Sequence, residues 1–237
     1  MKKEKKEEKK EQKKSGFREI FELIAETAVF VFFVMTFVVQ AFQIPTGSME
    51  PTLLIGDFLL VNKFVYAHTI SRVEGKILPR KKIERQDIIV FKWPQDLKMD
   101  FVKRVIALEG EKIEIKDRQV YINDKPIPEP YKVHIESQLS SRDNYYYYDD
   151  TIRGNFSPVV VPPGHCFAMG DNRDSSEDSR KWGFLPLDNI KGKPWLVYFS
   201  YKAEREAYKK TSVADRLKKL AMFIPKARWK RILLVIK

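Results

Sequence analysis

The sequence of 237 residues is poor in the residues that form covalent links and metal sites. Its one cysteine, Cys166, cannot form a disulfide within the chain, so the sequence neither requires nor excludes an oxidising compartment. The three histidines, His68, His134 and His165, are scattered, and their spacing is not that of metal ligands. We therefore expect no metal site, and nothing in the sequence predicts another cofactor.

A basic excess is also missing from the middle of the chain. The formal net charge of +12 comes from the two ends, since residues 1–19 carry +4, residues 202–237 carry +9 and residues 20–201 carry −1. A domain that binds nucleic acid has a basic face on its folded part. The charge pattern therefore argues against nucleic acid as a partner, and basic ends beside an apolar segment favour a bilayer with anionic lipid.

One apolar run, residues 20–42, has the sequence IFELIAETAVFVFFVMTFVVQAF. As a helix rising about 1.5 Å per residue, it could span a bilayer core of about 30 Å. Glu22 and Glu26 would then lie near the entry interface or face a partner. A buried core helix and a cleaved targeting peptide are the alternatives, but AFQIPTGSM is a poor cleavage site and a charged tail precedes the run. We predict an uncleaved transmembrane anchor.

The charges beside the anchor predict its orientation. The tail, residues 1–19, holds nine Lys and Arg, whereas none occurs between Phe42 and Lys63. The positive-inside rule then places the tail in the cytoplasm and everything from Gln43 onward on the other side. Because the tail MKKEKKEEKKEQKK is low in complexity and apolar content, we expect it to be disordered or at most a frayed helix.

Beyond the anchor, short apolar runs predict β-structure. They are about 4–8 residues long and rich in Val, Ile, Phe and Tyr, with Gly, Pro, Asp or Asn between them. The runs are DFLLVNKF, QDIIVFKW, DFVKRVIAL, EKIEIKD, RQVYIND and KPWLVYFS, and YINDKPI is typical of a hairpin with an Asn-Asp turn. The prediction is a mainly β protein, with a Greek-key or barrel-like body of coiled antiparallel sheet from residues 43–115 and 163–201.

Two regions differ from this body. Residues 116–162 contain IPEPY, four successive tyrosines at 145–148 and DDTIRGN, which we interpret as an inserted β cap. Residues 202–237 are basic, and five apolar side chains in them share one helical face. These are Val213, Leu217, Leu220, Ala221 and Ile224. The pattern predicts a basic amphipathic segment on a bilayer, with a helix packed on the body and a disordered tail as alternatives.

Ser48 lies between Gly47 and Met49 in QIPTGSMEPTLLIGD, just past the apolar run. It is either a turn residue or a nucleophile with an unusual base. A serine hydroxyl attacks only when a base removes its proton, and no histidine lies near Ser48 in the sequence. A lysine can be that base if burial lowers its pKa from about 10.4.

Two lysines lie within apolar strands and could serve as this base. In DFVKRVIAL, Lys103 shares a strand face with Phe101 and Val105, and that face is apolar enough to keep the amine neutral. Arg104 points the other way and stays protonated. Lys92 in IIVFKWP is flanked in much the same manner. The residues alone leave the choice of lysine open.

Three segments, in order behind the apolar run, resemble those of the bacterial type I signal peptidases: IPTGSMEPTLLIGD, DFVKRVIALEGEKIEI and MGDNRDSSEDSRKWGFLP. These are membrane-bound serine endopeptidases that remove signal peptides from exported pre-proteins. The resemblance covers residues 44–115 and 163–200. It implies a single-pass protein of the bacterial inner (cytoplasmic) membrane, with its catalytic domain on the extracytoplasmic (periplasmic) face. The implied partners are signal peptides and the lipid bilayer.

The resemblance also implies roles for individual residues. Ser48 matches the nucleophile and Lys103 the general base of a Ser/Lys dyad. Thr46, where many members have serine, matches a hydroxyl that binds the oxyanion together with the Ser48 N–H. Ser176 matches a hydroxyl that orients the lysine amine. The other matches are structural: Gly47 for close approach of the substrate, Gly170, Asp171 and Asn172 for a turn in the site wall, and Asp178 with Arg180 for an ion pair.

Family members cut after small residues in an Ala-x-Ala pattern, which shallow apolar pockets would explain. The residues near the dyad in sequence that could line such pockets are Ile44, Pro45, Met49, Leu53 and Val102, with ordinary core packing as the alternative for each. We expect the substrate to bind extended and to add a strand to a sheet edge.

Two other functions are weighed against the peptidase. A related Ser/Lys protease such as a self-cleaving repressor carries a DNA-binding domain where this chain has its apolar run, so residues 1–43 argue against it. A non-catalytic, membrane-anchored β-domain would have no need of Ser48, Lys103 and Ser176, which are all present.

Overall fold

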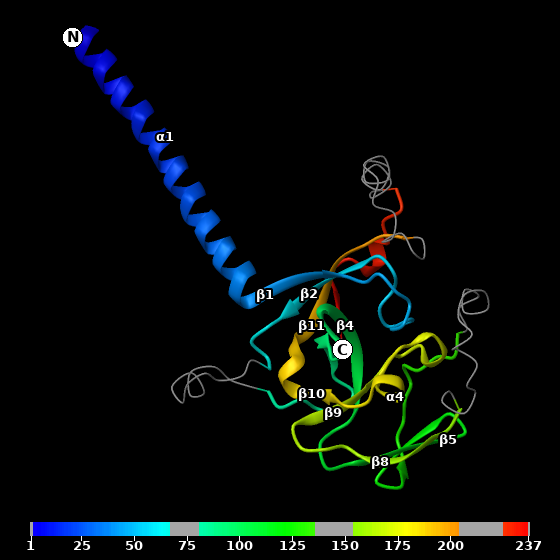
Figure 1. Ribbon diagram of the computed structural model, residues 1–237. Coiled ribbons are helices and arrows are strands. Elements are labelled where there is room, and N and C mark those ends of the chain that lie inside the picture. Colours follow the sequence, from blue (N-terminus) through cyan, green and yellow to red (C-terminus); the bar gives the residue numbers. More distant parts are fainter. Residues whose placement is uncertain (1, 67–80, 136–153, 204–224, 237) are drawn as a thin grey trace. The chain divides into compact units, whose positions relative to one another are not determined.

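The computed structural model describes residues 2–66, 81–135, 154–203 and 225–236 (Figure 1). The chain divides into two compact units, Met1–Gln40 and Ala41–Lys237. Two features singled out in the sequence lie outside the described residues. These are the four tyrosines at 145–148 and the amphipathic pattern at 213–224.

The helices and strands of the described residues are α1 (Lys2–Phe33), η1 (Val34–Val38), β1 (Val39–Gln43), β2 (Asp57–Asn62), β3 (Ile88–Trp93), β4 (Asp96–Ala107), β5 (Lys112–Lys116), β6 (Gln119–Ile122), β7 (Lys125–Pro126), β8 (Phe156–Val160), β9 (His165–Met169), η3 (Arg173–Ser175), α4 (Ser179–Trp182), β10 (Leu185–Pro186), η4 (Leu187–Asn189), β11 (Ile190–Ser200), η5 (Trp229–Arg231) and β12 (Leu234–Val235).

The N-terminal unit is one long helix, α1, followed by a short π-helical stretch, η1. Of the two forms predicted for the tail, disorder is not seen, and helical geometry begins at Lys2 as in the alternative of a helix. Lys, Glu and Gln are all good helix formers, and a composition that excludes a core does not exclude a helix. Helical geometry ends at Val38, and Val39–Gln43 forms strand β1, so the helix expected over residues 20–42 is shorter at its C-terminal end.

Across the described parts of the chain, no helix combines the length and the apolar sequence that a membrane crossing requires. The anchor predicted for residues 20–42 is thus not seen as a membrane span. The second half of α1 nevertheless leaves many large apolar side chains open to solvent. Those more than half exposed are Phe17, Ile20, Phe21, Leu23, Ile24, Val29, Phe30, Phe32 and Phe33.

The larger sheet has the strand order β1-β2-β11-β3-β4-β9-β10, with β12 added on β11. Its registered pairs are antiparallel, which confirms the prediction of a mainly β protein with antiparallel sheets. The order ends at β1 and β10 and does not close, so the barrel-like expectation is wrong. Strand β10 has only two residues, and one of them, Pro186, has no N–H with which to continue the ladder.

A smaller sheet, with the order β7-β6-β5-β8, corresponds to the predicted cap. It begins at Lys112, four residues before the expected boundary at residue 116. The Asn-Asp turn is present, with positive φ at both Asn123 and Asp124 as a tight hairpin turn requires. Ile113 and Ile122 of this sheet share one core cluster with Ile106, Phe167 and Met169 of the larger sheet.

Residues 225–236 form η5 and β12, and β12 pairs with β11 (Figure 1). These residues belong to the segment 202–237, for which the sequence predicts contact with a bilayer, with packing on the body as an alternative. The backbone of residues 225–236 packs on the body, because its extended apolar stretch forms hydrogen bonds with β11.

Candidate active site

The loop that carries Ser48 joins β1 to β2 and is closed at its base by backbone hydrogen bonds. Ile44 N–H donates to Asp57 O at 2.8 Å, and Gly56 N–H donates to Ile44 O at 2.9 Å. Met49 and Leu53 anchor the loop in the core, where they are 1% and 0% exposed. These hydrogen bonds and the burial of Met49 and Leu53 fix the conformation of the loop and therefore the position of Ser48.

Lys103 lies on β4 opposite Ile89 of β3, and its side chain is buried beside Ser48. A hydrogen bond of 2.8 Å joins Lys103 Nζ and Ser48 Oγ. Lys92, the other candidate base, is exposed near the end of β3. The geometry therefore favours Lys103, since only this lysine is both kept from water and in reach of the hydroxyl.

Burial lowers the pKa of the Lys103 amine from 10.5 to about 8. The negative charges of Asp178, Glu177 and Asp171 oppose this effect, and the positive charge of Arg180 adds to it. The amine also lies 5.5 Å from the centre of the Phe101 ring, on the apolar face expected from the strand alternation. At pH 7 roughly a tenth of Lys103 is thus neutral and able to accept a proton, and the neutral form predominates above about pH 8.

Replacing Lys103 with methionine should raise the stability of the protein at pH 7. The unfolded chain binds a proton at this lysine up to pH 10.5, but the folded chain only up to about pH 8. The free energy of unfolding of the wild type therefore rises as the pH rises from about 8 to 10.5. Below pH 8 it is lower than above pH 10.5 by up to about 3 kcal/mol, because the folded chain then buries a charged amine. Methionine fills a similar volume without a charge.

Urea unfolding of both proteins at pH 7 and pH 10 measures this effect. We expect Lys103→Met to exceed the wild type in stability at pH 7 and to lose most of that advantage at pH 10. An advantage that is equal at the two pH values would contradict the lowered pKa.

Arg104, the neighbour of Lys103, points to the opposite side of β4 and forms a bidentate ion pair with Asp171. Its Nε and Nη2 donate to the two carboxylate oxygens of Asp171, each at 2.8 Å, and Nη1 donates to Gln86 O at 2.8 Å. Asp171 also accepts a hydrogen bond of 2.5 Å from the Thr52 hydroxyl. Asp171 thus links β4, the strand of Lys103, to the loop that carries Ser48.

The turn after β9 contacts the main chain of Ser48 directly. Asn172 N–H donates to Ser48 O at 3.1 Å, and the Asn172 side-chain amide donates to Gly47 O at 3.4 Å. Gly170 lies against the same peptide, because a Cβ placed there would come within 2.5 Å of Ser48 O. This turn therefore lies directly against the main chain of Gly47 and Ser48, and a role in the site wall stays a prediction of the resemblance for Gly170, Asp171 and Asn172.

Ser176 is buried beside this turn, and its Oγ would lie 2.3 Å from a Cβ placed on Gly170. Its Oγ lies close enough to Asp178 to help keep that carboxylate ionised, yet it completes no hydrogen bond with a described residue. The structure brings Ser176 to the site, while its proposed bond to the Lys103 amine is not formed here.

Asp178 and Arg180 form the expected ion pair beneath the site. Arg180 Nε and Nη2 each donate to Asp178 at 2.8 Å, and Asp178 also accepts from Gly170 N–H at 3.1 Å. Burial acts to raise the pKa of Asp178, but the Arg180 charge and these hydrogen bonds outweigh it and lower that pKa. The carboxylate therefore stays charged and holds the turn at Gly170.

The remaining predicted residues divide by exposure. Thr46 and Pro45 are exposed, and Val102 is half-buried, so all three are accessible to a substrate beside Ser48. Ile44, Met49 and Leu53 are buried members of one core cluster. In this conformation these three support the loop from below rather than line an open pocket.

Sequence reasoning missed several residues that build the site. The Thr52 hydroxyl donates to Asp171, and the Tyr131 ring stacks on the Arg104 guanidinium, whose Cζ lies 4.0 Å from the ring centre. Arg173, in the turn after β9, forms a buried ion pair with Glu129. Thr52 lies inside the quoted IPTGSMEPTLLIGD segment, but Glu129 and Tyr131 come from the cap sequence IPEPY, where no local signal pointed to the site.

The arrangement can carry out nucleophilic chemistry on a carbonyl group. A buried amine within hydrogen-bond distance of a serine hydroxyl can act as its general base. Within the described residues, no three His, Cys, Asp or Glu side chains gather where a metal ion could be held.

Comparison with known proteins identifies the family. A model of the family described as "Signal peptidase, peptidase S26" matches residues 17–199. The signal peptidase I of Pseudomonas aeruginosa is 35% identical over 189 residues, covering 70% of this chain and 66% of that protein. The signal peptidase I of Aquifex aeolicus is 34% identical over 220 residues, covering 73% of this chain and 80% of that protein.

A crystal structure of a signal peptidase I from Enterococcus faecalis is 30% identical and matches 48% of this chain and 97% of that chain, with a TM-score of 0.38. The family model matches most of the chain, and it includes Ser48, Lys103 and Ser176. The chain therefore belongs to the signal peptidase family, peptidase S26.

Proposed function

We propose that the protein is a serine endopeptidase that removes signal peptides from exported pre-proteins, with Ser48 as nucleophile and Lys103 as general base. The observation that carries the proposal is the 2.8 Å contact between Lys103 Nζ and Ser48 Oγ, made where both side chains are buried. Membership of the signal peptidase family supports the reaction class and the type of substrate.

The mechanism begins with transfer of the Ser48 hydroxyl proton to the neutral Lys103 amine as Ser48 Oγ attacks the scissile carbonyl carbon. The oxyanion that forms is stabilised by the Ser48 N–H and the Thr46 hydroxyl. The Lys103 ammonium then gives its proton to the leaving amine, which releases the mature protein. Neutral Lys103 next accepts a proton from a water molecule as that water attacks the acyl carbon. The Lys103 ammonium returns the proton to Ser48 Oγ as the ester bond breaks, which releases the cleaved signal peptide and restores the dyad.

The proposal includes a preference for small residues before the cut, in the Ala-x-Ala pattern. The accessible side chains beside the dyad are Pro45 and Val102, and the buried residues Met49 and Leu53 close the space beneath them. A site with a filled floor accepts a methyl group and excludes a longer side chain, because the core beneath it is already packed.

The proposal also includes attachment to a bilayer, with the catalytic body on the extracytoplasmic side. Support comes from the apolar side chains exposed along α1 between Phe17 and Phe33, which water alone would not favour. The basic residues at the start of the chain would face anionic lipid on the cytoplasmic side.

Incubation of the purified full-length protein with a pre-protein in detergent or vesicles tests the proposed function. We expect one cut after an Ala-x-Ala sequence, and N-terminal sequencing of the product locates it. Substitution of the alanine just before the cut by a large residue such as tryptophan should prevent cleavage. An intact pre-protein after prolonged incubation would overturn the proposal.

The pH dependence of cleavage reports the protonation of Lys103. Below pH 8 the amine is mostly protonated and cannot accept the Ser48 proton, so kcat/KM should fall about tenfold for each pH unit. It should level off above about pH 8, the pKa of the buried amine. A profile with its midpoint near 6.5, the value of histidine, would count against Lys103 as the base.

A further inference from the structure

The C-terminal strap, residues 225–236, lies beyond the residues 17–199 that match the family model. It runs back along β11, where Leu233 N–H donates to Val197 O at 2.8 Å and Ile236 N–H donates to Trp195 O at 2.9 Å. Figure 1 shows the strap in red beside the orange strand β11. These bonds fix the strap as an ordered part of the catalytic body.

One side chain of the strap, Arg231, reaches the loop that carries the nucleophile. Its Nη2 donates to Asp57 at 2.6 Å and to Thr52 O at 2.9 Å, and its Nε donates to Asp57 at 3.2 Å. Asp57 is fully buried and also accepts from Leu54 N–H at 2.8 Å. One guanidinium group thus joins both ends of the segment 52–57, which begins four residues after Ser48.

Thr52 is held from its other side by the network next to the base. Its hydroxyl donates to Asp171 at 2.5 Å, and Asp171 is gripped by Arg104, the neighbour of Lys103. Arg231 therefore fixes the Thr52 main chain while Asp171 fixes its side chain. A continuous set of charge-assisted hydrogen bonds runs from the strap to the strand of the general base.

The strap also makes an apolar contact that is independent of these charges. Ile236 packs against the core cluster to which Met49 and Leu53 of the loop belong. The strap and the loop therefore share one apolar core in addition to the ion pair.

We propose that Arg231 is a positioning residue that holds the 52–57 segment so that Ser48 Oγ stays within reach of Lys103 Nζ. This inference rests on the proposed function. Arg231 is the nearer of two cations at Asp57, since Arg228 Nη1 lies 3.8 Å from the same carboxylate. A buried carboxylate that loses its closest cation is destabilised, so Asp57 would draw water or move toward Arg228 when Arg231 is removed. The displacement would pass to Ser48, and a shift of about 1 Å at a nucleophile can slow a reaction by as much as about a hundredfold.

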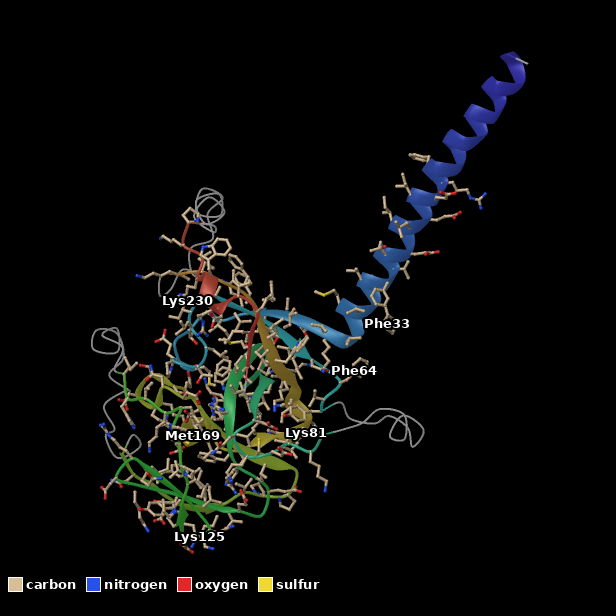
Figure 2. The ribbon with its side chains drawn as sticks, turned by 180° about the vertical axis from the view of Figure 1, so that it is seen from behind. Phe33, Phe64, Lys81, Lys125, Met169 and Lys230 are labelled. Atoms are coloured by element: carbon tan, nitrogen blue, oxygen red, sulfur yellow. The ribbon has the colours of Figure 1, made fainter. Side chains whose placement is uncertain are left out.

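The kinetic test compares Arg231→Gln with Lys230→Gln in the full-length protein. Both variants remove one positive charge from η5, but Lys230 is exposed (labelled in Figure 2), and no contact of its side chain with the nucleophile loop is seen. We expect Arg231→Gln to lower kcat about tenfold with KM changed less than about twofold, and Lys230→Gln to match the wild type. Arg231→Lys, which keeps the charge, should recover part of the loss.

Hydrogen exchange gives a readout that needs no cleavage. The Leu53, Leu54 and Asp57 amides all donate within the loop, to Met49 O, the Asp57 carboxylate and Leu54 O. Their exchange should be about tenfold faster in Arg231→Gln and unchanged in Lys230→Gln. If Arg231→Gln does not fold, Arg231→Lys replaces it, with a kcat loss and an exchange gain of about threefold each.

The outcomes separate the two proposals. A wild type that cleaves, with a variant whose loop exchanges faster and whose kcat falls, supports the role of Arg231. A wild type that cleaves, with a variant whose kcat or whose loop exchange stays at the wild-type value, overturns the role of Arg231 and leaves the proposed function standing. A wild type that cleaves no pre-protein overturns the proposed function itself, whatever the exchange data show.

Discussion

Substitution of Ser48 by alanine should abolish cleavage of a pre-protein, with kcat at least about a thousandfold lower and no loss of folding. The change removes the atom that attacks the carbonyl, and no other described hydroxyl contacts the Lys103 amine. Lys103→Ala should have an effect of the same size, because the residues of a catalytic dyad act as a unit. Gel analysis of pre-protein processing, with circular dichroism to verify folding, measures both.

Lys92→Ala is the matched control for the lysine variant. It removes a lysine from β3, the strand paired with β4. The Lys92 side chain is exposed, so it lacks the burial that lowers the pKa of Lys103. We expect processing at the wild-type rate. Normal processing by Lys103→Ala, or loss of processing in Lys92→Ala alone, would end the assignment of Lys103 as the base.

Substitution of Gly170 by alanine should be the most damaging change outside the dyad. The new Cβ would lie 2.5 Å from Ser48 O and 2.6 Å from Ser176 Cβ, and neither group can move without displacing the nucleophile or the turn. Overpacking of this kind destabilises by about 1–3 kcal/mol. Cleavage should fall about a hundredfold or more, because the Ser48 peptide must shift to make room.

Gly47→Ala provides the comparison for stability. The atoms nearest to a Cβ at Gly47 would be those of the Glu50 carboxylate, at 3.0 Å, and the end of a flexible side chain moves aside more easily than a main-chain carbonyl. Urea unfolding should therefore show a loss below about 1 kcal/mol for Gly47→Ala and a larger loss for Gly170→Ala. Equal losses in the two variants would show that the contact between Gly170 and the Ser48 peptide is not as tight as described.

The strands and the pairing of the dyad could be predicted because their signals are local or carried by a resemblance. Alternation along DFVKRVIAL placed Lys103 and Arg104 on opposite faces of a strand, and β4 has this arrangement. The choice between Lys103 and Lys92 needed the resemblance, since burial depends on distant strands. The Asn-Asp turn was also evident, because positive φ at two successive residues favours those side chains.

The features that could not be predicted depend on contacts between distant parts of the chain. The tail sequence alone leaves disorder and a frayed helix open, because its low apolar content gives no core while lysine and glutamate favour a helix; the structure has helical geometry from Lys2. The sheet stays open at β10, a strand of only two residues, and the sequence has no local signal for so short a strand. The strap was missed because the pairing of Val235 with Leu196 and the bond from Arg231 to Asp57 join residues far apart in sequence.

The most direct test of the central claim is a titration of the Lys103 amine itself. Nuclear magnetic resonance of the folded protein with labelled lysine side chains, with the Lys103 signal assigned by its absence in Lys103→Met, yields the pKa of this one group. The geometry predicts a midpoint near pH 8, because the amine is buried beside Ser48. A midpoint near 10.5, that of a lysine in water, would show that Lys103 is charged at neutral pH and cannot be the base that activates Ser48.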